Sequence, residues 1–247
     1  YPNDGTDEGR RLRLKQQHFF VSCSLQDMLR SLEKRSIPIT EFSKHWTVQL
    51  NDTHPAIAVA ELMRLLIDQY QIGWDKAWNI TTSSVAYTNH TLLPEALEKW
   101  DLGLFNDLLP RHLEIIYEIN WRFLQQLRLR YPGDDKILQK LSIIDEEGSK
   151  SVRMAHLATI GAHHINGVAT LHSDLIKRQL LPEFAALWPE KFTNVTNGVT
   201  PRRWVALSNP SLSNLLEEEV GPNWITNMEL LKKLEDKQND ANFLQKF

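Results

Sequence analysis

Polar side chains that could bind a hydroxyl-rich ligand follow an apolar, strand-like run at residues 47–51. Asn51, Asp52 and His54 bring an amide, a carboxylate and an imidazole together just before Pro55. In open α/β sheets, ligands bind outside the carboxyl ends of strands, where the free N–H groups of the next helix also point. We therefore expect these three side chains to line a ligand site.

The same arrangement recurs at two later junctions. Residues 80–87 form a β-branched run that predicts a strand, and His90 follows it. Residues 194–200 contain Asn197 and run into a proline. Three such junctions could place amides, a carboxylate and two imidazoles around one crevice. Hydroxyl-rich ligands need this mixture of hydrogen-bond donors and acceptors.

The hydrophobic periodicity around these junctions is largely helical, and together with the strands it fits the α/β class. A loop is predicted at residues 1–9 and a hairpin tip at 145–150. The predicted helices are residues 10–34, 57–70 and 95–100, two helices divided near Pro110, residues 152–181 with breaks near Gly161 and Gly167, and most of the chain after Pro201.

The composition disfavours two classes of partner. With 247 residues and 42% apolar content, the chain can bury a large core, as one large domain or two small ones. A net charge of -3 and no Lys/Arg run longer than a pair leave no electrostatic footprint for nucleic acid. No segment approaches 18 uninterrupted apolar residues, and the start does not resemble a signal peptide. We therefore expect a cytoplasmic protein with no nucleic-acid or membrane partner.

Cysteine and tryptophan usage give two further expectations. Cys23 is the single cysteine, which excludes an intrachain disulfide, fits a reducing compartment and predicts a packing role. Eight tryptophans are a high number. Because tryptophan serves protein cores as readily as sugar stacking, both interpretations stay open.

Two other kinds of catalytic site fit the sequence less well. Nine histidines suggest a metal-dependent hydrolase, with Asp52, His54, His90 and His163 as candidate ligands. The chain has no His-Glu-x-x-His motif and no cysteine pair, so we disfavour a metal site. It also lacks the Gly-x-Ser-x-Gly elbow of a serine hydrolase and the glycine-rich loops that bind nucleotides.

Seven long motifs occur in order along the chain. They are YPND, EGRRLRLKQ, QLNDTHP, YTNHT, LPEALEKW, LPRHLEIIYEIN and TNGVTPRRW, at residues 1–4, 8–16, 49–55, 87–91, 93–100, 109–120 and 196–204. Through these motifs the chain resembles the glycogen/starch/maltodextrin phosphorylases, the α-glucan phosphorylase family, from its first residue to its last.

The resemblance implies an internal fragment of a two-domain GT-B glycosyltransferase, which is built from two Rossmann-like domains. Residues 1–196 would be the latter part of the N-terminal, glucan-binding domain, and residues 197–247 the truncated start of the C-terminal domain. Family members cleave the terminal α-1,4 bond of a glucan with inorganic phosphate, giving glucose 1-phosphate with retention. The implied partners are glycogen, starch or maltodextrin together with phosphate, and the full-length parent is expected to be a homodimer.

The resemblance also implies pyridoxal 5'-phosphate in the full-length parent. The cofactor lysine and the residues that bind phosphate belong to the C-terminal domain, and no segment of this chain matches them. We therefore expect no cofactor and no metal on the fragment, and no turnover by it alone. The alternative from another class is a non-catalytic α-glucan-binding or scaffold protein derived from the N-terminal domain.

Residue roles follow from the resemblance as expectations. His90 matches the catalytic histidine, which hydrogen-bonds the glucosyl 6-hydroxyl and offers its main-chain carbonyl to the developing oxocarbenium ion. Asn197 matches the asparagine that hydrogen-bonds the same hydroxyl, and Asp52 and His54 match residues that line the adjoining pocket. The remaining residues matched to substrate binding are Asn3, Asp4 and Gly5 of a mobile gate loop, Arg13 behind that loop, and Glu98.

A remote glucan storage site is implied at Tyr117, Glu146 and Lys150. Two departures from the family pattern bear on these roles. The gate loop has Gly5 where the family usually has asparagine, and the storage region has Trp121 where animal enzymes carry glutamine.

Overall fold

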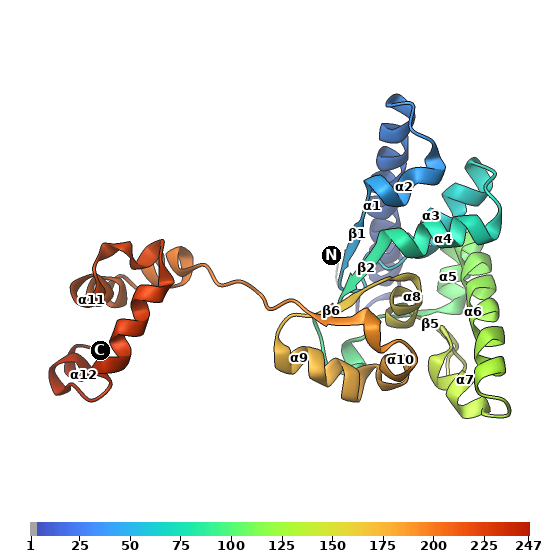
Figure 1. The fold of residues 1–247 in the computed structure, drawn as a ribbon. Helices are drawn as coiled ribbons and strands as arrows, with labels where there is room; N and C mark the ends of the chain where they lie inside the picture. The colour runs from blue at the N-terminus through green and yellow to red at the C-terminus, as the bar shows by residue number, and fades with distance from the viewer. Residues whose placement is uncertain (1–3) are drawn as a thin grey trace. The chain divides into compact units, whose positions relative to one another are not determined.

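The computed structural model describes residues 4–247, so Asn3 of the predicted gate loop lies outside the described residues. The described chain forms two compact units (Figure 1). The first ends at Thr196, and the second spans Asn197–Phe247. No helix among the described residues is long and apolar enough to cross a membrane.

A four-stranded parallel sheet lies at the centre of the first unit. Its order is β1-β2-β6-β7. The strands are β1 (Val48–Asn51), β2 (Val85–Thr88), β6 (Ile165–Gly167) and β7 (Phe192–Asn194). Every neighbouring pair is parallel, and Leu50 of β1 pairs with Tyr87 of β2. Both side chains have no exposed surface. A parallel sheet of this kind needs crossover connections that cover its faces with helices.

The helices supply most of the core of the first unit. α3 packs against α1, α4, α6 and α8, and Ala58–Met63 of α3 is entirely buried. The helices are α1 (Asp7–Lys34), α2 (Phe42–His45), α3 (Ala58–Arg64), α4 (Trp74–Ser84), α5 (Leu102–Leu108), α6 (Pro110–Arg130), α7 (Asp135–Leu141), α8 (Met154–Gly161), α9 (Thr170–Leu175) and α10 (Pro182–Leu187). π-helical turns extend α3 over Leu65–Gln69 and α9 over Ile176–Leu180.

A small antiparallel sheet flanks the helices, in the order β3-β5-β4. Its strands are β3 (Lys99–Asp101), β4 (Ile144–Asp145) and β5 (Ser151–Arg153). The exposed residues between β4 and β5 confirm the hairpin tip predicted at 145–150.

The second unit is helical, as the sequence predicts. It contains a π-helical turn (Arg202–Leu207), α11 (Pro210–Val220), two 3-10 segments (Pro222–Ile225 and Met228–Lys237) and α12 (Ala241–Lys246). Trp224 is fully buried in this unit, where Leu215 and Leu216 of α11 are also buried.

The predicted strand at 80–87 is wrong over its first half. α4 continues to Ser84, and only residues from Val85 onward form β2. Inside the helix the hydroxyls of Thr82 and Ser84 donate to the carbonyls of Trp78 (2.9 Å) and Ile80 (2.7 Å). These bonds satisfy the polar groups locally, so tertiary packing overrides the β propensity of the run.

Three other sequence predictions need correction. Residues 95–100 are not a helix, because a 3-10 turn covers only Pro94–Ala96, and the buried Trp100 lies in β3 and pairs with Val152 of β5. The breaks predicted near Gly161 and Gly167 within residues 152–181 are confirmed, but a strand, β6, lies between them and separates α8 from α9. Cys23 is exposed on α1 rather than packed in the core.

Candidate functional site

The carboxyl ends of β1, β2, β6 and β7 meet at one edge of the parallel sheet. The N–H of Asp52 donates to the carbonyl of Thr88 (2.9 Å), and the N–H of Asn89 donates to the carbonyl of Asn166 (3.0 Å). The N–H of Val195 completes the series with the carbonyl of Gly167 (3.1 Å). Backbone pairing therefore brings the segments after all four strands to the same edge of the sheet, and we use the name strand-end crevice for this edge and the loops that follow it.

A row of polar side chains crosses this edge. The amide of Gln49 donates to the hydroxyl of Thr88 (2.8 Å), which donates to the side-chain carbonyl of Asn166 (2.8 Å). Sequence reasoning missed Asn166, because it lies in a segment that was predicted to be helical. The sequence did contain a signal for Asn166, because it directly precedes Gly167, and the polar residues predicted at the other strand ends also stand just before a turn.

Asp52 turns the chain sharply at the end of β1. Its φ of 66° lies in the left-handed region, where aspartate is among the few residues other than glycine found regularly. Its carboxylate accepts a hydrogen bond from the N–H of Thr53 (2.7 Å). Asp52 and His54 are both half-buried, so each keeps a surface available to a ligand.

Asn89 fixes the loop that carries His90. Its buried amide donates to the hydroxyl of Tyr87 (3.1 Å), and its side-chain carbonyl accepts from the N–H of Thr91 (3.1 Å). Burial raises the pKa of Tyr87 far above its usual value, so this phenol stays neutral. His90 itself is exposed, which leaves its imidazole accessible to a ligand.

His172 is a neighbour of His90 that the sequence did not single out. Its Nδ1 accepts a hydrogen bond from the N–H of Val168 (3.1 Å), just after β6. Burial and, to a smaller extent, His90 lower the pKa of His172, which keeps the ring neutral near pH 7. Gly167 permits this contact, because a Cβ there would lie 2.7 Å from His172 Nδ1.

The predicted gate residues Asp4 and Arg13 meet Glu98 near the start of α1. Arg13 forms ion pairs with Asp4 (Nη1 to Oδ2, 2.7 Å) and with Glu98 (Nε to Oε1, 3.4 Å). Gln17, which the sequence analysis did not select, also donates to Glu98 Oε1 (2.8 Å). Gly5 is exposed beside Asp4. The structure therefore joins motifs that are more than eighty residues apart in the chain.

The residues predicted for glucan storage lie on separate elements. Tyr117 is 45% exposed on α6, while Glu146 and Lys150 are exposed on the β4–β5 hairpin. Among residues 4–247, no hydrogen bond or ion pair joins Tyr117 to either of them. Asn197 begins the second unit and is exposed.

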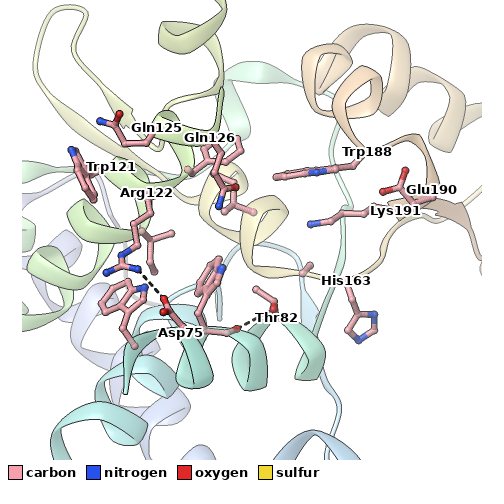
Figure 2. Close-up of a pocket in the computed structure, with 16 residues that line it drawn as sticks. Asp75, Thr82, Trp121, Arg122, Gln125, Gln126, His163, Trp188, Glu190 and Lys191 are labelled. Atoms are coloured by element: carbon pink, nitrogen blue, oxygen red, sulfur yellow. Dashed lines mark hydrogen bonds and ion pairs between the residues drawn. The ribbon is translucent and has the colours of Figure 1, made fainter. Parts of the chain in front are cut away.

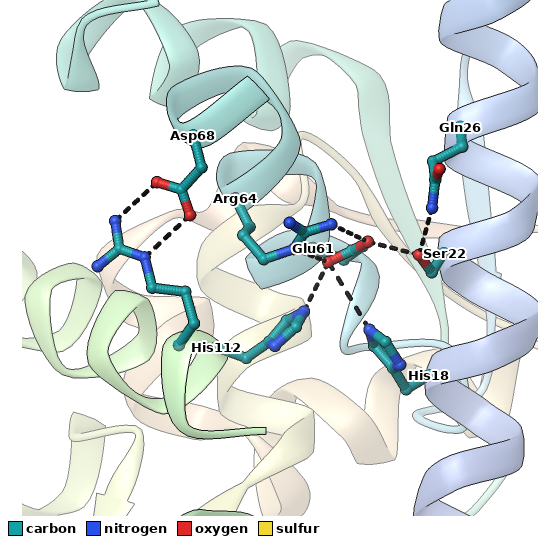
Figure 3. Close-up of polar contacts among 8 residues, drawn as sticks. His18, Ser22, Gln26, Glu61, Arg64, Asp68 and His112 are labelled. Carbon is teal, nitrogen blue, oxygen red and sulfur yellow. Dashed lines mark hydrogen bonds and ion pairs between the residues drawn. The ribbon is translucent and has the colours of Figure 1, made fainter. Parts of the chain in front are cut away.

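A buried charge cluster lies away from the crevice (Figure 3). Glu61 has no exposed surface and accepts hydrogen bonds from Ser22 (2.7 Å) and from Arg64 (2.7 and 2.9 Å), and His112 Nε2 lies 2.6 Å from it. His18, Glu61 and His112 are near enough to one another to hold a metal ion, within the part of the chain that the structure describes. Arg64 already neutralises the carboxylate, so the arrangement favours a structural ion pair.

The fold and its strand-end crevice define an α/β protein with carboxylate, amide and imidazole groups gathered at one edge of a parallel sheet. The family model for carbohydrate phosphorylases matches residues 1–247, and the chain belongs to that family.

Three relatives show the extent of the similarity. The chain is 60% identical over 245 residues to a glycogen phosphorylase of Synechocystis, covering 99% of this chain and 29% of the relative. It is 51% identical over 247 residues to one of Chlamydia trachomatis (100% and 30%) and 48% identical over 252 residues to one of Saccharomyces cerevisiae (100% and 28%). The chain therefore spans less than a third of the length of these relatives.

Proposed function

We propose that this chain forms the glucosyl-binding part of an α-1,4-glucan phosphorylase. The full-length parent would cleave the terminal α-1,4 bond of glycogen, starch or maltodextrin with inorganic phosphate, releasing glucose 1-phosphate with retention. The single observation that carries the proposal is the identity of 46–60% to relatives named glycogen phosphorylase over nearly the whole chain. The crevice supports it, because its polar groups suit a hydroxylated ring.

Within a GT-B architecture, the parallel sheet of the first unit would be part of one Rossmann-like domain. The second unit would be the start of the other domain. Ligands bind at the carboxyl edge of such sheets, which is where Asp52 and His90 lie. Asn197 would contribute from the second domain.

His90 would act directly on the glucosyl unit. Its exposed imidazole can pair with the 6-hydroxyl, and its main-chain carbonyl can face the positive charge that develops as the ring becomes an oxocarbenium ion. A fixed dipole of this kind stabilises the transition state more than the ground state. Asp52 and His54 would bind neighbouring hydroxyls, while Asp4, Gly5, Arg13 and Glu98 would control access.

The cofactor of the parent would be pyridoxal 5'-phosphate, which supplies the catalytic phosphate when bound. Holding it requires a lysine amine for the Schiff base. The segments at the crevice, residues 51–54, 88–92, 166–173 and 194–196, contain no lysine. These residues do not fit the group, so we assign the cofactor to the remainder of the parent and propose that the chain alone does not turn over.

We further propose that the parent is a cytoplasmic homodimer that uses a glucan and phosphate and binds neither nucleic acid nor membrane. The non-catalytic alternative is not favoured, because the relatives at 46–60% identity are named as phosphorylases.

The test is His90→Ala in the full-length parent, with steady-state kinetics and melting temperature measured together. Losing one hydrogen bond to an uncharged hydroxyl costs about 0.5–1.5 kcal/mol, so kcat should fall about 2- to 13-fold, and further if the hydroxyl is stranded in a dry site. His45→Ala, at an exposed residue of α2, is the matched control and should change nothing. A collapsed melting temperature with normal turnover of the folded fraction would show that His90 is only structural.

A further inference from the structure

A histidine at the strand-end crevice has one ring nitrogen bonded and the other enclosed without a partner. His172 lies on α9, which packs against β6 and β7. Its Nδ1 accepts a hydrogen bond from the N–H of Val168 (3.1 Å). Its Nε2 is shielded from solvent and has no hydrogen-bond partner among the residues that the structure describes. A buried polar group without a partner is costly, so this nitrogen needs an explanation.

The bonded nitrogen fixes the tautomer of His172. A neutral imidazole has one N–H donor and one acceptor nitrogen. Because Nδ1 accepts from Val168, the proton of the neutral ring lies on Nε2. The ring stays neutral near pH 7, since burial and, to a smaller extent, His90 lower the pKa of His172. His172 therefore holds an uncharged N–H donor at Nε2.

The main chain beside both imidazoles is held in place. The N–H of Asn89, the residue before His90, donates to a backbone carbonyl of β6 (3.0 Å). The hydroxyl of Ser173, the residue after His172, donates to the side-chain carbonyl of Asn194 (2.8 Å) at the end of β7. Since these bonds fix the backbone, the two rings can approach each other only by rotation of a side chain.

The imidazole of His90 is the acceptor that can reach the enclosed donor. Nε2 of His172 is closed to solvent, so a ligand cannot reach it either. His90 lies close enough for its charge to influence the pKa of His172, and its exposed side chain can rotate. When one nitrogen of a neutral ring accepts a hydrogen bond, the other nitrogen carries the proton. Acceptance from His172 would therefore make the second nitrogen of His90 a donor.

We propose that His172 is a positioning residue for His90. Its Nε2–H donates to one ring nitrogen of His90 when a glucosyl unit occupies the crevice, so that the other nitrogen donates to the 6-hydroxyl. The choice of this hydroxyl rests on the proposed function. His172 touches no substrate atom, but it sets the tautomer and the orientation of the ring that does.

The tautomer is tested in the 247-residue chain by NMR of the imidazole nitrogens near pH 7. His172 should show a protonated Nε2 and an unprotonated Nδ1. A proton on Nδ1 of His172 would overturn the proposal, because the ring could then neither accept from Val168 nor donate from Nε2.

Two substitutions separate the roles of the two ring nitrogens. The amide oxygen of asparagine can replace Nδ1 as the acceptor for Val168, but the side chain is too short to donate from the position of Nε2. The amide nitrogen of glutamine reaches that position. In the full-length parent, His172→Asn should lower kcat about 2- to 13-fold, the range of one lost hydrogen bond, at an unchanged melting temperature. His172→Gln should retain more of kcat. Unchanged kcat in His172→Asn, or equal losses in the two variants, would contradict the proposal.

His163 provides the matched control. It lies just before β6, at the opposite end of that strand, and lines a pocket between α4, α6 and α8 (Figure 2). Burial lowers the pKa of His163 as it does that of His172. His163→Asn should leave kcat unchanged, and a loss equal to that of His172→Asn would show that the effect is not specific to the crevice.

The sharpest readout is the coupling between His172 and His90. If His172 acts through His90, His172→Asn should cause no further loss of kcat in the His90→Ala background. A purely structural role would give the same fold-loss in both backgrounds, and that result would overturn the proposal.

These experiments separate the inference from the proposed function. If the parent releases glucose 1-phosphate and the two losses multiply, the role of His172 alone fails. If the parent has no phosphorylase activity, the proposed function fails, whereas the tautomer of His172 is still tested in the 247-residue chain.

Discussion

Glu61 is a carboxylate on α3 with no exposed surface that accepts hydrogen bonds from Ser22 and Arg64 and lies 2.6 Å from His112 Nε2 (Figure 3). Burial alone would raise the pKa of Glu61, but the hydrogen bonds from Arg64 and its neighbours hold it well below its usual range. Burial lowers the pKa of His112 although Glu61 opposes this effect. The cluster joins three helices, because Ser22 lies on α1, Glu61 and Arg64 lie on α3, and His112 lies on α6. The packing of these three helices against one another therefore depends on one buried carboxylate.

Replacing Glu61 with glutamine should reduce the free energy of unfolding at pH 7 by about 3–5 kcal/mol, since the half-buried Arg64 would lose its charged partner inside the cluster. Urea denaturation measures this change. Glu114→Gln breaks an exposed pair with Arg111 and should cost no more than about 1 kcal/mol. Equal losses in the two variants would contradict the role assigned to Glu61.

The pH dependence has a definite sign. Because the folded pKa of Glu61 is depressed, its stabilising contribution is present above the unfolded value of 4.5 and is lost as pH falls below it. The difference between the wild type and Glu61→Gln should therefore shrink below about pH 4.5. A difference that stays constant down to pH 3 would contradict this account.

At the scale of elements, α8 approaches α3 closely enough to require glycine. A Cβ on Gly161 would lie 2.6 Å from Val59 Cγ2 and 2.7 Å from Val59 Cγ1. The sequence indicated a helix break near this glycine, and α8 does end there. It did not reveal the reason, because contact between residues about a hundred positions apart depends on tertiary packing.

Gly161→Ala should therefore reduce the free energy of unfolding by about 1–3 kcal/mol through overpacking. Val59→Ala should reduce the free energy of unfolding less in the Gly161→Ala background than in the wild type, because the space left by the valine methyl groups accommodates the new alanine methyl group. Gly198→Ala is the control, since a Cβ there would meet nothing within 4 Å. Additive losses at positions 161 and 59 would show that the two side chains do not compete for space.

The helices and strands also show which parts of the fold could be predicted from sequence patterns. The long amphipathic helices α1 and α6 were predicted correctly, as was the break at Pro110, because each has many periodic apolar residues. The short segments at 80–87, 95–100 and 165–167 were misassigned, because their state depends on pairing with distant strands. Asp52 and His90 were found at the crevice from residue type and junction pattern. Asn166 and His172 were missed at this edge, because only the pairing of the strands brings them there. Gln17 was missed because only tertiary packing brings it to Glu98.

At the scale of the whole molecule, the chain separates into a unit ending at Thr196 and a unit spanning Asn197–Phe247. Among the described residues of the first unit, the buried hydrophobic core extends from Leu14 to Phe192. Asn197, proposed to share the glucosyl hydroxyl with His90, begins the second unit. Our proposal therefore makes catalysis a property of the parent, in which the remaining part of a phosphorylase, more than two thirds of its length, would supply the cofactor.

The most direct measurement is the release of glucose 1-phosphate from maltodextrin and inorganic phosphate, assayed for the full-length parent and for the 247-residue chain side by side. We predict release by the parent, with the absorbance of bound pyridoxal 5'-phosphate, and neither signal from the chain alone. A parent that binds maltodextrin without releasing glucose 1-phosphate would contradict the assignment of a phosphorylase. Release by the isolated chain would contradict the placement of the cofactor outside it.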